Sequence, residues 1–265
     1  MQKGTKIAIS GKGGVGKTTV CAVLAQLYAE EGFDVIAVDA DSDANLCNAF
    51  GIPPEQSSEP LIRMKQLIAE RTGTGKEAVG AYFKLNPKIS DLPEKYCLEI
   101  PESSLKLLSL GSVTQAGGGC ACPEGAFLKA MLTHTILQRQ EVVIVDLAAG
   151  LEFMGRSSVQ GIDALIVVVE PGSRSIETAV NITAMAQKLG VKHVAGIINK
   201  VTSPQQIETI KSQLKDLTIL ATIDYSCEVQ QADLYCKSVY RSSPILVDRL
   251  TGAKGVLTKL LSSTS

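Results

Sequence analysis

The stretch Gly11-Lys12-Gly13-Gly14-Val15-Gly16-Lys17-Thr18-Thr19 decides the fold of this 265-residue chain. It has the form G-x-x-x-x-G-K-T, and it lies between a strand pattern that ends at Ser10 and a helical pattern that begins at Thr18. Glycines let backbone N–H groups curl around phosphates, and the helix N-terminus adds a favourable dipole. The motif in this setting predicts a nucleotide site. We expect Lys17 to neutralise the β- and γ-phosphates and the Thr18 hydroxyl to ligate Mg²⁺. The nucleotide-binding residues of the loop would be Gly13, Gly14, Val15, Gly16, Lys17, Thr18 and Thr19.

Short apolar runs alternate with stretches of helical length along the chain, which is typical of a parallel sheet with crossover helices. The expected strands are 6–10, 34–39, 105–110, 141–146, 164–169, 193–198 and 217–223. The expected helices are 17–31, 60–71, 124–139, 174–189, 204–215 and 245–261. The run Val142-Val143-Ile144-Val145 is apolar on both faces, so it belongs inside the sheet. The sequence predicts a single α/β P-loop domain over residues 1–265, with a mostly parallel twisted sheet and helices on both faces.

Residues 53–104 differ from the rest, because six prolines punctuate a polar stretch with one amphipathic helix at 61–68. We interpret this segment as an excursion from the core fold. Long excursions in α/β proteins are often functional and can equally be decoration. A surface that binds a partner and a structural cover therefore both stay open.

Bulk composition narrows the classes of partner and compartment. A formal net charge of −1 removes long-range attraction to phosphate polymers, so nucleic acid is not an expected partner. Residues 1–6 carry no apolar signal segment, and no apolar run reaches the roughly 18 residues that span a bilayer. We expect a cytoplasmic protein whose seven cysteines are mostly reduced.

A second lysine, Lys12, lies just inside the loop. The stretch G-K-G-G-V-G-K-T-T resembles the deviant Walker A motif of the MinD, ParA and nitrogenase iron protein superfamily, whose members dimerise across their nucleotides. The resemblance implies an ATPase that converts ATP and water to ADP and phosphate. It also implies that Lys12 reaches the partner subunit's phosphates and compensates charge in the transition state. A solvated loop lysine is the alternative.

Acidic residues end two of the expected strands. Asp39 and Asp41 lie at the edge of the sheet beside the phosphate loop, where acids can orient water or hold the water shell of a metal. By resemblance to the first switch segment of the superfamily, Asp41 positions the attacking water and Asp39 supports it. An acidic helix N-cap is the alternative, with Asp43 as a candidate. Asp146 closes the apolar run 142–145, which is the Walker B form, and we expect it to help hold Mg²⁺.

The preference for a base can be argued from Asn199-Lys200-Val201-Thr202. GTPases follow Asn-Lys with a spaced Asp that accepts the guanine N–H groups, and Thr202 stands at that position. The acceptor is missing, which favours ATP over GTP. By resemblance to the superfamily, Asn199 contacts adenine, and we place Lys200 in the same nucleotide site. The segment 223–225 would cover the other face of the base, although relatives usually carry Pro where this chain has Asp224.

Two cysteines, Cys120 and Cys122, follow three glycines and precede Pro123, just before an expected helix. Helix N-termini lower thiol pKa values. Two thiolates are too few for a tetrahedral metal site. If the superfamily's two-fold dimer brings both pairs to its axis, four thiolates would form an intersubunit site for Zn²⁺, Ni²⁺ or an iron–sulfur cluster. Incidental loop cysteines are the alternative.

Further motifs point to one branch of the superfamily. The Cys-Ala-Cys-Pro-Glu loop at 120–124, the switch at 146–152 and Glu-Pro at 170–171 resemble the CooC-type ATPases. Leu-Ile-x-Met-Lys at 61–65 and Leu-Asn-Pro-Lys at 85–88 extend the resemblance. It implies a homodimeric metallochaperone that assists nickel insertion into apo carbon monoxide dehydrogenase, or into acetyl-CoA synthase in a sister group.

Two other functions stay open at this point. A MinD- or ParA-like positioning ATPase would use a basic amphipathic C-terminal helix at the membrane. The segment 255–262 is superficially similar, but it has only Lys254 and Lys259 as nearby cations after Arg249, so membrane binding is not expected. An electron donor with a bridging iron–sulfur cluster is the other alternative. The nitrogenase iron protein has its second cluster cysteine after the switch segment, and residues 147–156 of this chain contain no cysteine. This argues against the usual cluster of such an electron donor.

Overall fold

The computed structural model describes residues 4–41, 43, 45–74, 83–112, 122–138, 141–148, 161–215 and 217–263. The strands are β1 (Lys6–Gly11), β2 (Val35–Ala40), β3 (Leu98–Glu99), β4 (Leu105–Ser109), β5 (Val142–Leu147), β6 (Ala164–Val169), β7 (His193–Val201) and β8 (Thr218–Asp224). The longer helices are α1 (Lys17–Glu30), α3 (Lys65–Thr72), α5 (Pro123–Gln138), α7 (Ser173–Leu189), α8 (Pro204–Gln213), α9 (Cys227–Leu234) and α11 (Pro244–Ser262). The short helical elements are α2 (Leu46–Ala49), α4 (Leu92–Tyr96), α10 (Val239–Ser242) and the 3-10 turns η1 (Pro54–Gln56) and η2 (Leu61–Arg63).

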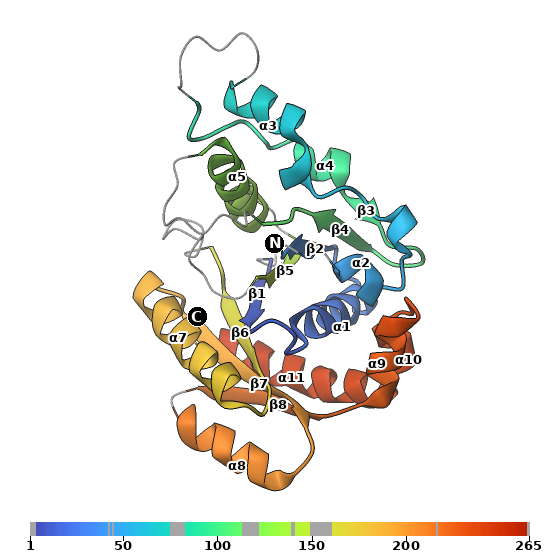
Figure 1. The fold of residues 1–265 in the computed structure, drawn as a ribbon, viewed down its shortest axis with the longest axis vertical. Coiled ribbons are helices and arrows are strands. Elements are labelled where there is room, and N and C mark those ends of the chain that lie inside the picture. The colour runs from blue at the N-terminus through green and yellow to red at the C-terminus, as the bar shows by residue number, and fades with distance from the viewer. Residues whose placement is uncertain are drawn as a thin grey trace.

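The described strands form one eight-stranded sheet in the order β3-β4-β2-β5-β1-β6-β7-β8 (Figure 1). Every neighbouring pair is parallel except β3 and β4, which are antiparallel. At this edge Glu99 lies opposite Lys106, and opposite charges directly across an antiparallel pair stabilise it slightly. The prediction of a mostly parallel α/β sheet is confirmed.

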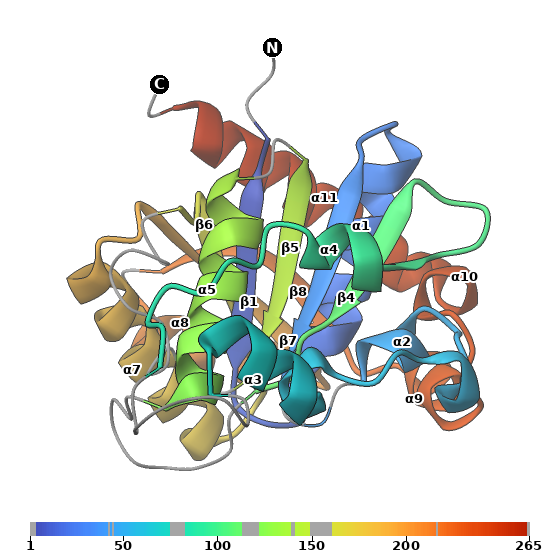
Figure 2. The same ribbon diagram turned by 90° about the horizontal axis from the view of Figure 1, so that it is seen from above.

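Helices cover both faces of the sheet and give two separate apolar cores (Figures 1 and 2). One core contains buried side chains of α1, α2, α9, α10 and α11, and the other contains side chains of η2, α3, α4, α5, α7 and α8. The central strands β1, β5 and β6 are buried along their whole length. Strands that are covered on both faces need continuous apolar runs, which explains the pattern at 142–145 and 164–169.

The C-terminal helix α11 packs on the core. Its buried residues are Leu246, Leu250, Ala253, Lys254 and Leu257, a spacing that lines one helical face. The ammonium of Lys254 pairs with the Glu31 carboxylate and lies 4.9 Å from the centre of the Tyr28 ring at the end of α1. The apolar face of α11 is therefore occupied within the subunit. In the part of the chain that the structure describes, no helix is long and apolar enough to span a bilayer.

The segment 53–104 departs from its prediction of one helix at 60–71. Met64, with φ −76° and ψ 74°, separates η2 from α3. The backbone N–H of Ile62 donates to the Leu110 carbonyl at 3.1 Å, which ties this turn to the end of β4. The N–H groups of a first helical turn have no partner within the helix, so this bond is compatible with a helical start, and the helix is broken instead at Met64. The segment also contributes α4 and the edge strand β3, neither of which was predicted.

Candidate functional site

The phosphate loop joins β1 to α1, and two of its glycines are required by close contacts. Gly11 has φ +152°, and a Cβ there would lie 2.3 Å from the Val168 carbonyl oxygen of β6. Gly16 has φ +98°, and a Cβ there would lie 2.3 Å from Asn199 Nδ2. A side chain at either position would therefore both strain the backbone and collide with a neighbouring strand end.

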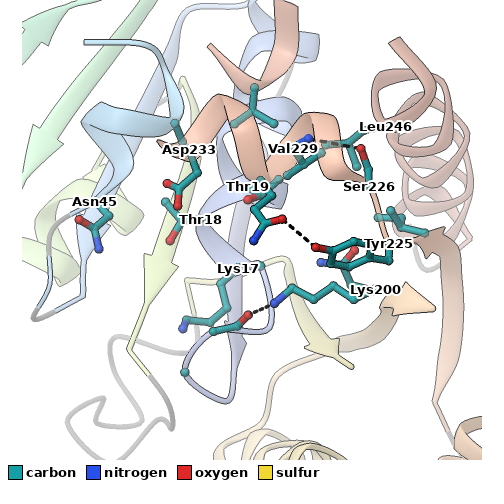
Figure 3. Close-up of a pocket in the computed structure, with 18 of the residues that line it drawn as sticks. Lys17, Thr18, Thr19, Asn45, Lys200, Tyr225, Ser226, Val229, Asp233 and Leu246 are labelled. Atoms are coloured by element: carbon teal, nitrogen blue, oxygen red, sulfur yellow. Dashed lines mark hydrogen bonds between the residues drawn. The ribbon is translucent and has the colours of Figure 1, made fainter. Parts of the chain in front are cut away.

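Two residues at the end of β7 hold the loop from outside. Asn199 Nδ2 donates to the Val15 carbonyl at 2.8 Å, and this amide is buried. The ammonium of Lys200 donates to the Gly14 carbonyl, drawn as a dashed line in Figure 3, and pairs at 3.2 Å with Oε2 of Glu170, the residue after β6. Lys200 itself has φ +58°. The loop is thus fixed by its neighbours, which leaves fewer conformations to lose when a ligand binds.

The two lysines of the motif have different surroundings. Lys17 is buried, and its ammonium lies 3.5 Å from Asp41 Oδ2. Lys12 is half-buried beside the exposed Gly13 and Gly14, and its side chain makes no hydrogen bond or ion pair with any described residue. A cation without a partner in its own subunit is available to a group that approaches from outside.

Asp146 at the end of β5 faces the first turn of α1. Thr18 Oγ1 donates to Asp146 Oδ2 at 2.6 Å, whereas Asp146 Oδ1 is buried and has no partner. Burial raises the pKa of Asp146 to about 7, against the lowering effect of the Thr18 hydrogen bond; the Asp39 carboxylate raises it further, and the Lys17 ammonium lowers it. Oxygen ligands from a hydroxyl, a carboxylate and water suit Mg²⁺. The orphaned oxygen and the Thr18 hydroxyl therefore fit a hydrated magnesium ion bound with phosphate.

Asp39 supports the backbone of the segment that carries Asp41. Its Oδ2 accepts from the Leu46 N–H at 2.9 Å, and its Oδ1 accepts from the Asp41 N–H at 3.2 Å. Burial raises the pKa of Asp39 to about 6, although both backbone hydrogen bonds lower it. Asp39 lies directly opposite Asp146 in the sheet. The buried Asp39 thus has no free face for water, whereas Asp41 lines the cavity next to Lys17.

A cavity of about 700 Å³ extends from the phosphate loop to the segment after β8. Its lining includes Lys17, Thr18 and Asp41 together with Asn199 and residues 223–226. Figure 3 shows Lys17 and Thr18 on one side of the cavity and Tyr225 and Ser226 on the other. This volume is within the range of small-molecule sites. Lys17, Thr18, Asp41, Asn199 and Lys200, which the sequence analysis assigned to the nucleotide site, thus line one continuous space.

Helix α9, which follows the predicted segment 223–225 and also lines this space, was not predicted from the sequence. Helix α9 begins after Ser226, whose Oγ accepts from the Val229 N–H at 3.3 Å, and the Tyr225 hydroxyl donates to Gln230 Oε1 at 2.8 Å. A Ser followed by an acid in the first turn is a helix start signal, and Ser226 with Glu228 could have revealed α9. Nothing in the sequence indicated that Glu170 would reach Lys200.

Of the cysteine pair, Cys122 is described and Cys120 lies outside the described residues. Cys122 directly precedes α5, and its Sγ accepts from the Gly125 N–H at 3.3 Å. The described ranges contain no group of three or more His, Cys, Asp or Glu side chains that could hold a metal ion. A four-cysteine site between subunits stays a prediction.

Comparison with known proteins agrees with this geometry. The family of CobQ/CobB/MinD/ParA nucleotide binding domains matches residues 6–239. The chain is 42% identical over 246 residues to the carbon monoxide dehydrogenase accessory protein CooC of Rhodospirillum rubrum, with 92% of each protein covered. It is 39% identical over 246 residues to an uncharacterized ATP-binding protein of Methanocaldococcus jannaschii, and the match covers 92% of this chain and 91% of that protein.

Solved structures show the same fold. The septum site-determining protein MinD of Pyrococcus horikoshii, complexed with Mg-ADP, superposes with a TM-score of 0.68 at 20% identity over 98% of both chains. MinD of Aquifex aeolicus superposes with a TM-score of 0.66 at 19% identity, covering 96% of this chain and 97% of that chain. The chain therefore belongs to the CobQ/CobB/MinD/ParA nucleotide-binding domain family, and it is an ATP-hydrolysing P-loop protein.

Proposed function

We propose that the protein is a cytoplasmic, nucleotide-dependent homodimeric ATPase that assists nickel insertion into apo carbon monoxide dehydrogenase, or into acetyl-CoA synthase. The observation that carries the proposal is the 42% identity to CooC over 92% of both chains. At that coverage the whole α/β domain is compared, including the excursion 53–104, rather than the nucleotide motifs alone.

The catalytic part of the proposal assigns roles along the cavity. Lys17 neutralises the β- and γ-phosphates, and the backbone N–H groups of 13–19 bind their oxygens. Thr18 and Asp146 hold Mg²⁺, which supplies charge stabilisation at the phosphates when it is bound. Asp41 orients the attacking water, since its carboxylate already lies 3.5 Å from the Lys17 ammonium. Asp39 keeps that segment in place through its two backbone hydrogen bonds.

The dimeric part of the proposal rests on Lys12. Its ammonium is half-buried at the mouth of the loop and has no partner among the described residues of its own subunit. In a dimer closed over two nucleotides, Lys12 would contact the phosphates bound by the other subunit. Such a cation stabilises transition-state charge only when the dimer has formed, so hydrolysis would be coupled to the closed state.

The metal cargo would be held by the cysteine loop. One chain offers Cys120 and Cys122, which is half of a tetrahedral thiolate site. Two chains related by a two-fold axis would supply four thiolates, a set that suits Ni²⁺ or Zn²⁺. ATP binding would favour the state in which the pairs meet, because a ligand shifts an equilibrium by its differential affinity for the two states.

Nickel titration combined with a measurement of molecular mass tests this proposal. Wild-type protein should bind one Ni²⁺ per dimer more tightly with ADP or ATP than without nucleotide. Cys122→Ser is an informative variant, because serine can also cap α5 in place of the thiol while it is a poor soft-metal ligand. Cys120→Ala should lose the site as well. Full nickel binding by either variant would refute the four-cysteine site.

The matched control is Cys227→Ser, which removes an exposed thiol at the start of α9. It should leave nickel stoichiometry and dimerisation unchanged. A coloured product after anaerobic reconstitution with iron and sulfide would instead favour an electron donor with a bridging cluster.

A membrane-positioning ATPase is less well supported. Its membrane version needs a free apolar helix face, whereas five residues of α11 are buried against the core. Sedimentation with anionic liposomes in the presence of ATP should leave the protein in the supernatant.

A further inference from the structure

The base end of the cavity carries an acidic side chain with no partner. Asp224 ends β8 opposite Val201 of β7, and it lines the same cavity as Asn199. Its carboxylate is exposed and makes no hydrogen bond or ion pair with any residue in the described ranges. An ionised carboxylate only accepts hydrogen bonds, so it favours a ligand that presents N–H groups.

Asn199 presents an acceptor to the same end of the cavity. Its Nδ2 is committed to the Val15 carbonyl at 2.8 Å. A carbonyl oxygen needs a donor, so the amide cannot be turned around without loss of this bond. Of the Asn199 amide, Oδ1 and the second hydrogen of Nδ2 remain for a ligand, and Oδ1 is again an acceptor.

Two further polar side chains of β7 and the residue after it are engaged with protein groups. The Thr202 N–H and hydroxyl both donate to Gln206 Oε1, at 2.8 and 3.2 Å. The Lys200 ammonium is held by Gly14 and Glu170. Asp224 and Asn199 Oδ1 thus offer two acceptors to this cavity from the ends of adjacent strands.

We propose that Asp224 is a specificity-determining residue whose carboxylate accepts a hydrogen bond from the exocyclic amino group of adenine. That group carries two hydrogens, so it can donate to Asp224 and to Asn199 Oδ1 together. A 6-oxo purine would place its carbonyl oxygen against the Asp224 carboxylate, and two acceptors cannot share a hydrogen bond when neither carries a hydrogen. The chain would thus distinguish 6-amino from 6-oxo purine nucleotides without the spaced Asp that GTPases use.

Calorimetric binding of ADP, IDP and GDP with Mg²⁺ tests this inference. The inference rests on the proposed nucleotide site and does not depend on metal delivery. Diphosphates are used because they are not hydrolysed during the titration. Wild-type protein should bind ADP about tenfold or more tightly than IDP. In Asp224→Ala the affinity for ADP should fall on the order of tenfold, the scale of one hydrogen bond to a charged group, while the affinity for IDP stays level or rises. Asp224→Asn still offers an oxygen to the amino group, so its affinity for ADP should fall less.

The control is Asp248→Ala, which removes the same charge from an exposed position on α11 outside the cavity. It should leave all three affinities unchanged. Equal loss of ADP and IDP binding in Asp224→Ala, or no loss at all, would overturn the inference. Selective loss of GDP binding would also overturn it, because the carboxylate would then read the guanine N–H pair. Absence of ADP binding to wild-type protein would instead contradict the nucleotide site itself.

Discussion

The Thr18 hydroxyl donates a 2.6 Å hydrogen bond to Asp146 Oδ2, so the first turn of α1 is tied to the end of β5. The second oxygen of the same carboxylate is buried without a partner. Without bound nucleotide, this arrangement leaves a desolvated charge, which is unfavourable unless the group takes up a proton. With hydrated Mg²⁺ and phosphate in place, the same oxygen would gain a partner.

The pKa values of Asp146 and Asp39 predict a pH-dependent stability of the nucleotide-free protein. Both are raised from 3.8, to about 7 and about 6. Between about pH 4 and pH 7 the folded state therefore binds more protons than the unfolded state, and the free energy of unfolding falls as pH rises. Urea denaturation between pH 5 and pH 8 measures this slope.

Asp146→Asn isolates the larger contribution. The amide keeps an oxygen for Thr18 and carries no charge, so the variant should be more stable than wild type at pH 8 by roughly 1–3 kcal/mol. It should also lose the stabilisation that Mg-ADP gives to wild type. The exposed Asp248→Asn serves as the control. An unchanged pH slope in Asp146→Asn would mean that the carboxylate is hydrated in solution.

Gly16→Ala should damage the fold, whereas Gly13→Ala should not. The added Cβ at position 16 would meet Asn199 Nδ2 at 2.3 Å on a backbone with φ +98°, and we expect a loss of about 1–3 kcal/mol of stability. At Gly13 a Cβ meets nothing within 4 Å, so stability should change little while nucleotide affinity falls, because the methyl group would obstruct the phosphates. Thermal unfolding and ADP titration separate these effects. Equal melting temperatures for the two variants would contradict the close contact with Asn199.

Lys200→Met should weaken nucleotide binding, although Lys200 acts on the loop and not on the phosphates themselves. The ammonium holds the Gly14 carbonyl and Glu170, so its loss lets the loop sample other conformations, and we expect roughly a five- to twentyfold weaker affinity for ADP. Glu170→Gln should also weaken the affinity for ADP, but by a smaller factor. Arg241→Gln, which breaks the exposed pair with Glu102, should leave affinity unchanged. Wild-type affinity in Lys200→Met would show that the loop is ordered without this contact.

Lys12→Gln and Lys17→Gln should impair different steps, hydrolysis and nucleotide binding respectively. Lys17 is buried in the cavity of its own subunit, so its loss should abolish ATP binding. The Lys12 side chain makes no hydrogen bond or ion pair with the described residues of its own subunit, so Lys12→Gln should bind ATP normally while hydrolysis falls by about a hundredfold or more, on the scale of a charge supplied in trans. Filter binding and phosphate release measure the two properties. Normal hydrolysis by Lys12→Gln would remove the argument for a catalytic dimer.

The strong local signals in the sequence predicted most of the fold. The seven expected strands are all present within a few residues, because continuous apolar runs of that length have few alternatives in an α/β chain. The edge strand β3 has only two residues, too few for any periodicity. The prediction of one helix at 60–71 failed because Met64 has a non-helical ψ of 74° between η2 and α3, a break that the apolar pattern does not reveal.

The site was only partly predictable for a similar reason. Gly16, Lys17 and Thr18 belong to one motif and Asp146 to a second, and the form of each motif reflects the chemistry. The hydrogen bond of Asn199 to Val15 joins residues 184 positions apart, and sequence reasoning placed Asn199 against the base without its role in fixing the loop. Glu170 and the α9 segment become neighbours of the loop only through sheet order, which the sequence does not specify.

The most direct test of the account measures nickel in the target enzyme. Apo carbon monoxide dehydrogenase from nickel-free cells is incubated with limiting Ni²⁺, the protein and MgATP, and its metal content is then determined by mass spectrometry. We predict that nickel incorporation rises with wild-type protein and ATP, and that it stays at background with Cys122→Ser, with Lys12→Gln or without nucleotide. Equal nickel incorporation in the absence of ATP, or with Cys122→Ser, would contradict an ATP-driven metallochaperone.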